Sequence, residues 1–232
     1  MLGLKWKFKD FVYMFIGGLF VVVFTSIVYY ATDTKMVRVD EHNPKAQKIL
    51  NPIDGDFIIG DINAPVEVVF YGDFTCHHCM RFMKDIFFRL RDEYIFTGKV
   101  KFIFRPVITL KRSLFGSKFL FCDKRSDKKN AEILWKMFDK KWMMSDDYIN
   151  SLARLVVKEK WTTTEHFVDC TNSKEIQKRL YNMYLNTVKP LNIHETPHVF
   201  VNRMPTMTDK TIFSLIDKEY KRITTNNYIK NK

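Results

Sequence analysis

VEVVFYGDFTCHHCMRF, residues 66–82, contains the pattern from which the fold follows. Its first six residues are mostly apolar and rich in valine and aromatics, which is typical of a strand buried on both faces of a sheet. A glycine and an aspartate interrupt the run, and from Cys76 to about Tyr94 apolar residues recur every three or four positions. This change of period predicts that a strand gives way to a helix at the first cysteine.

Further strands are expected on both sides of this motif. KVKFIFRPV (99–107) follows the helix, and strand, helix and strand within about fifty residues form a βαβ unit with a parallel strand pair. DFIIGD (56–61) and PHVFVN (197–202) are shorter strand candidates, and the second precedes a turn at residues 203–205. The sequence thus predicts an α/β fold.

The stretch between these halves, residues 110–190, has no strand pattern of any length. It reads as a helical insertion, and a last helix is expected at residues 208–223, with Thr208 as its N-cap and a frayed tail behind it. The helical segments expected within the insertion are 131–142, 146–157, 164–170 and 175–188.

The N-terminal region carries the signs of membrane insertion and export. Residues 11–31 hold no charge, which is long enough for a membrane-spanning helix, and three lysines precede them. Tyr29 and Tyr30 before Ala31 make a poor cleavage site, so we expect a single transmembrane anchor, with a cleaved signal peptide as the alternative. Residues 1–35 are therefore the anchor or signal, and the polar residues 36–55 are a linker.

Composition narrows the class of protein. The 232 residues carry a net charge of +12, but lysine is scattered and forms no block with interleaved aromatics, so we expect no nucleic-acid partner. There are four cysteines: Cys76, Cys79, Cys122 and Cys170. In an exported protein an even number of cysteines is usually paired.

The two cysteines of CHHC suit redox chemistry better than other uses. A helix N-terminus stabilises a thiolate at Cys76, and Cys79, one turn on and on the apolar stripe, is expected to be more buried. Met80 stands where a haem-attachment motif needs histidine, which excludes a c-type haem. A metal site, for which no second Cys-x-x-Cys exists, and an inert disulfide remain as alternatives.

Three stretches of the sequence together resemble the DsbA-type thiol–disulfide oxidoreductases of the thioredoxin superfamily: APVEVVFYGDFTCHHC, FIFRP and TPHVFVN. The resemblance implies a thioredoxin-like fold with an inserted α-helical domain. Its expected boundaries are a first half at 56–109, a helical insertion at 110–190, a second half at 191–225 and a tail at 226–232.

The resemblance also implies roles for individual residues. Cys76 matches the nucleophile of the family, Cys79 its buried partner, and His78 the histidine often found before the second cysteine. Thr196 and Pro197 match the pair whose peptide bond is cis against the active-site disulfide, which leaves the Thr196 backbone available to a substrate strand.

Three further positions follow from the same resemblance. Asp73 matches a common acidic residue whose role the sequence does not explain. Cys122 and Cys170 fall where many relatives carry a second pair, so a structural disulfide between them is expected, with two free buried thiols as the alternative.

Two positions depart from the family pattern. His77 stands where proline is frequent, and Phe70 stands where many relatives have a buried acid. The remaining histidines, His42, His166, His194 and His198, are read as surface or packing residues, although the last two flank Pro197 and could touch substrate.

The implied function is the oxidation of cysteine pairs in exported proteins. The resemblance implies no bound cofactor, a quinone-linked membrane reoxidant of DsbB type as partner, and a periplasmic location tethered to the inner membrane. A disulfide reductase or isomerase is the alternative within the enzyme class. A non-enzymatic metal-binding or chaperone module that uses Cys76 and Cys79 is the alternative outside it.

Overall fold

The computed structural model describes Thr25 and residues 48–122, 126–138, 142, 144–206 and 209–230. The chain divides into two units, residues 1–38 and 39–232, and all labelled elements belong to the second. Apart from Thr25, the expected membrane span at 11–31 lies outside the described residues. Within those that are described, no helix is both long and apolar enough to cross a bilayer.

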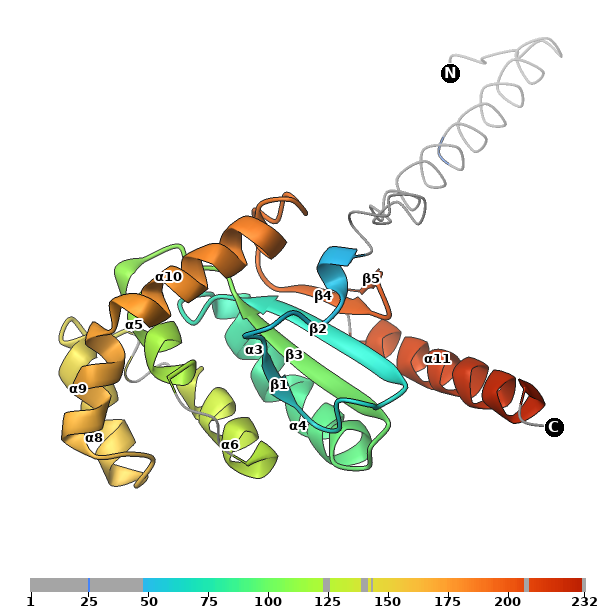
Figure 1. Ribbon diagram of the computed structural model, residues 1–232, viewed down its shortest axis with the longest axis horizontal. Coiled ribbons are helices and arrows are strands. Elements are labelled where there is room, and N and C mark those ends of the chain that lie inside the picture. Colours follow the sequence, from blue (N-terminus) through green and yellow to red (C-terminus); the bar gives the residue numbers. More distant parts are fainter. Residues whose placement is uncertain are drawn as a thin grey trace, which may run out of the picture. The chain divides into compact units, whose positions relative to one another are not determined.

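Five strands form one sheet in the order β1-β3-β2-β4-β5 (Figure 1). The central strands β2 (Val66–Gly72) and β3 (Val100–Pro106) are parallel, as the βαβ pattern predicts. The strands β1 (Phe57–Ile59), β4 (His198–Val201) and β5 (Met204–Thr206) pair antiparallel with their neighbours. All seven residues of β2 are buried, which confirms the reading of its apolar run.

The helix expected from Cys76 to Tyr94 exists but is broken. It consists of α3 (His77–Asp85), α4 (Phe87–Leu90) and the π-helical turn η1 (Arg91–Ile95). The break at Ile86 allows rings on both segments to pack against the sheet. Phe82 stacks on Phe70 with ring centroids 4.5 Å apart, and Phe87 meets Phe102 at 5.3 Å.

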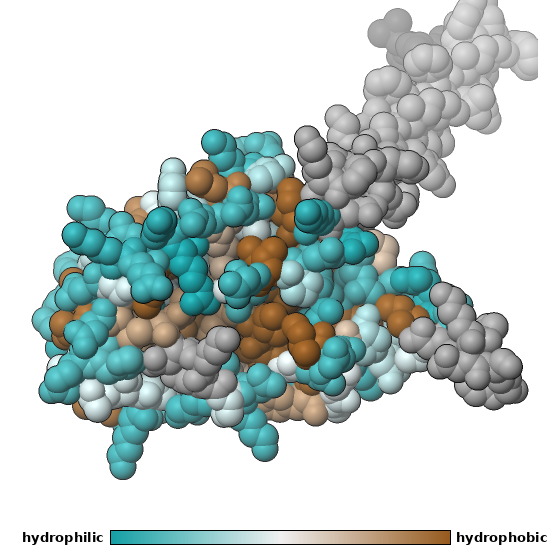
Figure 2. All heavy atoms as spheres, viewed as in Figure 1, coloured by the Kyte–Doolittle hydropathy of each residue, from teal (hydrophilic) through white to brown (hydrophobic). Residues whose placement is uncertain are grey.

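Side chains alternate between the two faces of the sheet, as the period of a strand requires. Val66, Val68 and Phe70 join the larger core on one face, to which α3, α4, α11 (Asp209–Lys230) and the helices between β3 and β4 contribute. Val69 and Tyr71 join a smaller core on the other face, together with Leu50 and residues near Ile193. Residues 48–55, expected to be linker, therefore include a fully buried side chain and belong to the folded domain. Figure 2 shows hydrophobic residues gathered over the sheet.

The stretch between β3 and β4 is helical, and its described residues form one helix more than the sequence predicts. The missed helix, α5, has an apolar period too weak to detect, because small residues such as Ser113, Gly116 and Ser117 line its buried face. A Cβ on Gly116 would come within 2.8 Å of the Trp142 ring, so this close approach requires glycine. The elements are α5 (Lys111–Leu120), α6 (Asp127–Met137), α8 (Tyr148–Lys158), α9 (Thr164–Asn172), α10 (Lys174–Met183) and η2 (Tyr184–Val188).

Two expectations near the C-terminus need correction. The turn predicted at residues 203–205 lies earlier, at Asn202 and Arg203, which both have positive φ and join β4 to β5 as a two-residue hairpin. The tail expected to be frayed is helical as far as Lys230. The proposed N-cap Thr208 lies outside the described residues.

A buried ion pair joins β3 to the segment before β1. The Arg105 guanidinium donates hydrogen bonds to both carboxylate oxygens of Asp56 at 2.8 and 2.9 Å, and both side chains are fully buried. Its remaining N–H groups donate to the carbonyls of Ile49 and Asn51 at 2.7 Å and to the Tyr71 hydroxyl at 2.8 Å. Arg105 thus fixes residues 49–56 against the sheet.

Replacing Asp56 with alanine should destabilise the domain strongly. The change leaves a buried guanidinium without its counter-charge, which costs about 3–5 kcal/mol in free energy of unfolding. Urea unfolding of the full chain, followed by circular dichroism, measures the loss. Glu93→Ala is the matched control, because it removes an ion pair with Arg89 in which both side chains are 54% exposed, and it should leave the midpoint almost unchanged. Equal midpoints for the two variants would contradict the role given to Asp56.

Candidate active site

Cys76 lies where β2 ends and α3 begins, as the sequence predicts. It is the N-cap of α3, with extended backbone at φ −81° and ψ 121°, and its sulfur accepts a hydrogen bond from the Cys79 N–H at 3.4 Å. Its side chain is half-buried, whereas Cys79 is fully buried. Neither thiol is in a disulfide, so the structure represents the reduced form of the pair.

The surroundings of Cys76 favour its thiolate. Together they lower the pKa of Cys76 to about 5, and the largest contribution comes from the Cys79 thiol, which hydrogen-bonds to the Cys76 sulfur. The Thr196 side chain and the backbone N–H groups of Cys79 and His78 act in the same direction, against the opposing effect of burial. At neutral pH Cys76 is therefore almost fully ionised, whereas an ordinary cysteine is only a few per cent thiolate.

Cys79 has the opposite character. Burial raises its pKa far above the ordinary value, and the neighbouring Cys76 raises it further. The side chain packs into the larger core with Phe70 and Phe82. Of two chemically identical groups one turn apart, Cys76 therefore carries the negative charge and Cys79 keeps its proton.

The Thr196–Pro197 peptide bond is cis, as expected from the resemblance. It immediately precedes β4, whose residue His198 pairs with Tyr71 on β2. This pairing brings the loop to the end of β2, where the Thr196 carbonyl oxygen lies 3.2 Å from the Cys76 sulfur and accepts a hydrogen bond from it only while Cys76 is protonated. Residues 120 positions apart in sequence thus meet at the reactive sulfur.

Asp73 has a structural role that the sequence did not reveal. Its buried carboxylate accepts hydrogen bonds from the Thr75 N–H and hydroxyl, both at 2.7 Å, and from the Thr109 N–H at 3.2 Å and the Thr109 hydroxyl. Its carbonyl accepts from the Cys76 N–H at 3.0 Å. Asp73 therefore ties the loop before Cys76 to the loop after β3. Thr75 and Thr109 were missed because neither belongs to a recognisable motif.

The histidines lie around the pair on the surface. His77 and His78 are exposed, with ring centroids 6.2 Å apart, and the described contact of His78 with Cys76 is through its backbone N–H. His194 is exposed and contacts the Asn192 side chain, and His198 Nδ1 lies 2.8 Å from the Glu195 carbonyl. His42 lies outside the described residues.

Phe70, where the resemblance leads us to expect a buried acid, lies in an aromatic cluster. The ring is fully buried and stacks on Phe82, and Phe102 and Phe104 lie at 6.0 Å. The space beneath α3 at this point is therefore apolar. As the sequence indicates, any proton acceptor for Cys79 is a group other than residue 70.

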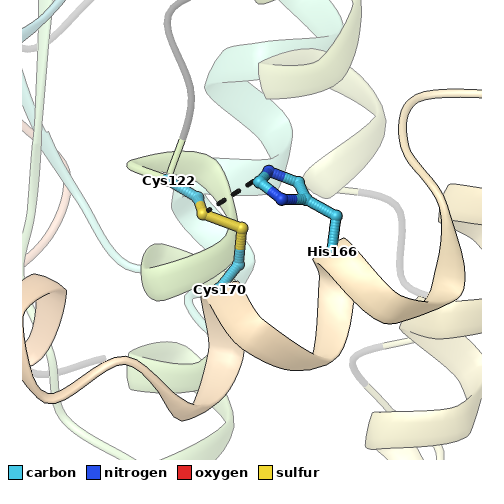
Figure 3. A group of neighbouring side chains, drawn as sticks. All are labelled: Cys122, His166 and Cys170. Carbon is cyan, nitrogen blue, oxygen red and sulfur yellow. Dashed lines mark hydrogen bonds between the residues drawn. A yellow bond between two sulfur atoms is a disulfide. The ribbon is translucent and has the colours of Figure 1, made fainter.

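The second cysteine pair is a disulfide, as predicted. It joins Cys122, just after α5, to Cys170 on α9, with Cα atoms 5.5 Å apart (Figure 3). The His166 ring, also on α9, faces this bridge, and its Nε2 lies 3.9 Å from the Cys122 sulfur. Within the described part of the chain, these three residues are the one group with metal-ligand spacing, and Cys76 and Cys79 belong to no such group.

Comparison with known proteins places this geometry in a family. The family model described as Thioredoxin matches residues 53–218. A Rickettsia bellii protein named as a protein-disulfide oxidoreductase is 29% identical over 179 residues, covering 75% of this chain and 68% of that protein. Disulfide bond formation protein D of Bacillus subtilis is 28% identical over 176 residues, covering 71% of this chain and 73% of that protein.

The fold also matches solved structures. The crystal structure of Wolbachia pipientis alpha-DsbA1 superposes with a TM-score of 0.70 at 24% identity, covering 78% of this chain and 98% of that one. Across the five Rickettsia relatives, the chain spans 55% to 68% of their length. The residues that the family model matches, 53–218, contain the five strands, the helices between β3 and β4 and all four cysteines of this chain.

Replacing Cys79 with alanine should raise the pKa of Cys76. The substitution removes the hydrogen bond that contributes most to the low value, so the ionisation step should move from about 5 towards the ordinary pKa of a thiol. The ultraviolet absorbance of the thiolate, followed against pH, measures it. The Cys76→Ala variant is the control and should show no step in the neutral range, because burial raises the pKa of Cys79. A Cys79→Ala titration that still centres on pH 5 would contradict this assignment.

The Cys122–Cys170 bridge should stabilise the fold. It closes a sequence separation of 48 residues, and loop-entropy arguments give a contribution of about 2–4 kcal/mol to the free energy of unfolding. Cys122→Ala with Cys170→Ala, made in a Cys76→Ala, Cys79→Ala background, isolates this bridge in urea unfolding. The background protein alone is the control. An unchanged midpoint would mean that the helices are held together without the cross-link.

Proposed function

Because this chain belongs to the thioredoxin family and resembles named protein-disulfide oxidoreductases, we propose that it introduces disulfide bonds into exported proteins. The observation that supports this direction is the unequal ionisation of the two thiols. Cys76 has its pKa lowered to about 5, while burial raises that of Cys79. Stabilising the thiolate stabilises the reduced enzyme, and a pair that is stable when reduced readily oxidises others.

The proposed reaction begins with the oxidised enzyme, in which Cys76 and Cys79 form a disulfide. A client thiolate attacks the Cys76 sulfur, the bond to Cys79 breaks, and a mixed disulfide between client and Cys76 forms. The leaving Cys79 sulfur takes up a proton, in keeping with its raised pKa. A second client thiolate then attacks the client sulfur of the mixed disulfide, and Cys76 leaves as a thiolate. The client loses two electrons and the enzyme gains them.

The solvent exposure of Cys76 and its low pKa both agree with this order of the two attacks. Cys76 is the sulfur that solvent reaches, so a client meets it first, and Cys79 is covered by the core. A thiol of low pKa leaves readily, which favours release of Cys76 in the second step. The Thr196 backbone beside Cys76 offers a client strand a hydrogen-bonding partner, the role proposed for Thr196 and Pro197.

Turnover requires an oxidant that removes the two electrons. We propose a quinone-linked membrane protein of DsbB type, and a periplasmic location with the apolar residues 11–31 as membrane anchor. The Cys122–Cys170 disulfide is compatible with an oxidising compartment, because disulfides persist there.

The first test is the redox potential of the Cys76/Cys79 pair, equilibrated with glutathione mixtures, with Cys122 and Cys170 intact. The expected value is above about −180 mV, because the reduced form is stabilised by its thiolate. Cys79→Ser is the control, since it removes the couple and retains the Cys76 thiolate. When its Cys76 is first converted to a mixed disulfide with glutathione, a client thiolate should displace glutathione and remain trapped as a mixed disulfide on Cys76.

A potential near that of thioredoxin, about −270 mV, would contradict the proposed direction. The pair would then be suited to donating electrons, and the reductase or isomerase alternative would replace the oxidase. Stoichiometric metal bound to Cys76 and Cys79, with Cys76 unreactive to alkylation, would instead support the metal-binding alternative.

A further inference from the structure

A groove lies directly beside the reactive cysteine, between α3 and α6. It has a volume of about 540 Å³ and begins at His77, the residue after the nucleophile. From α3 it is lined by Met80, Arg81, Met83, Lys84 and Asp85, and from α6 and the residue after it by Trp135, Lys136 and Phe138. We call it the α3–α6 groove.

The floor of the α3–α6 groove is apolar and well packed. Met80, Met83 and Phe138 belong to the larger core and are almost fully buried. Trp135 is half-buried and meets the Phe88 ring edge-on, with centroids 4.9 Å apart. Such a surface can receive an apolar or aromatic side chain of a bound segment.

The rim of the groove is positively charged. Arg81 and Lys84 are exposed, and neither makes an ion pair with any described residue. Lys136, by contrast, is held by Glu132 at 3.3 Å and also by Glu159. Asp85 is the single acidic residue among the lining residues described. Among the described lining residues, Arg81 and Lys84 are therefore the cations without an ion pair.

These two cations lie at different heights from Cys76 along the axis of α3. At about 1.5 Å of rise per helical residue, Arg81 lies about 7 Å and Lys84 about 12 Å along α3 from Cys76. An extended chain advances about 3.3 Å per residue, so the cations face positions about two and four residues from a client cysteine held at Cys76. Arg81 and Lys84 are three residues apart, which places them on one side of the helix.

We propose that the α3–α6 groove binds an acidic segment of the client protein, with carboxylates about two to four residues from the cysteine that attacks Cys76. This inference rests on the proposed function and specifies its substrate class. Complementary charge across an exposed rim mainly accelerates association, and the effect weakens with salt. The apolar floor would hold the side chain between the two carboxylates.

The experiment compares dithiol peptides that differ only in charge. One carries an aspartate pair two and four residues after its reactive cysteine, one carries the pair before it, and the third has asparagine at these positions. The oxidised full chain is mixed with each peptide at low salt. The rate of peptide oxidation is then measured by acid quench and chromatography. At least one acidic peptide should react about fivefold faster than the neutral one, and high salt should remove the difference.

Two double variants separate local binding from the overall positive charge. In the double variant that carries Arg81→Glu and Lys84→Glu, the oxidation rate of the acidic peptide divided by that of the neutral peptide should fall to about one or below. Lys218→Glu with Lys221→Glu on α11 changes net charge equally, at the same spacing and on exposed residues, and should keep the ratio near five. Arg81→Gln with Lys84→Gln gives a milder change if the reversed charges disturb folding.

The possible outcomes distinguish this inference from the proposed function. Two results would contradict the binding role of the groove without contradicting disulfide transfer. One is an equal oxidation rate for all three peptides, and the other is the same fall in the rate ratio in both double variants. If no peptide is oxidised at all, the proposed function fails, and the inference fails with it.

Discussion

Two thiols one helical turn apart cannot both ionise easily, because the negative charge of one opposes that of the other. In this chain burial decides between them. Cys79 points into the aromatic core and keeps its proton, and that proton then hydrogen-bonds to the Cys76 sulfur. The low pKa of Cys76 is thus a consequence of how α3 is packed on the sheet. The reactivity of the site therefore depends on the core as much as on the motif.

Several contacts hold α3 and its neighbouring loops in this position. Asp73 anchors the loop before Cys76 to Thr109, and the pairing of β4 with β2 brings Thr196 to the same sulfur. On the other face of the sheet, Arg105 secures residues 49–56 through a fully buried ion pair. These contacts join segments that are far apart in the sequence, so the site exists only when the whole domain is folded.

In the proposals made above, disulfide chemistry and client recognition use different parts of the same helix. The first turn of α3 carries the redox pair, whereas Arg81 and Lys84 on the next turns border the groove shared with α6. The helices between β3 and β4 thus contribute one wall of the groove beside Cys76. This division allows the charge of the groove to vary while the disulfide chemistry stays the same.

The sequence by itself determined the parts of this protein that depend on local patterns. The change of period at Cys76 indicated the strand and the helix on either side of it. Apolar runs indicated the other central strands, because a strand buried in a sheet consists mostly of apolar residues. The resemblance carried by CHHC and TPHVFVN led to the cis peptide at Pro197 and to the Cys122–Cys170 bridge, and the structure contains both.

Other features were decided only by the tertiary structure. The sequence did not indicate α5, since its buried face is made of small residues whose fit depends on the Trp142 ring. The role of Asp73 and the charge of the α3–α6 groove were equally hidden, because each depends on residues from separate elements. A pattern along one chain records which side chains are buried, but the partners they meet there are set by packing between distant segments.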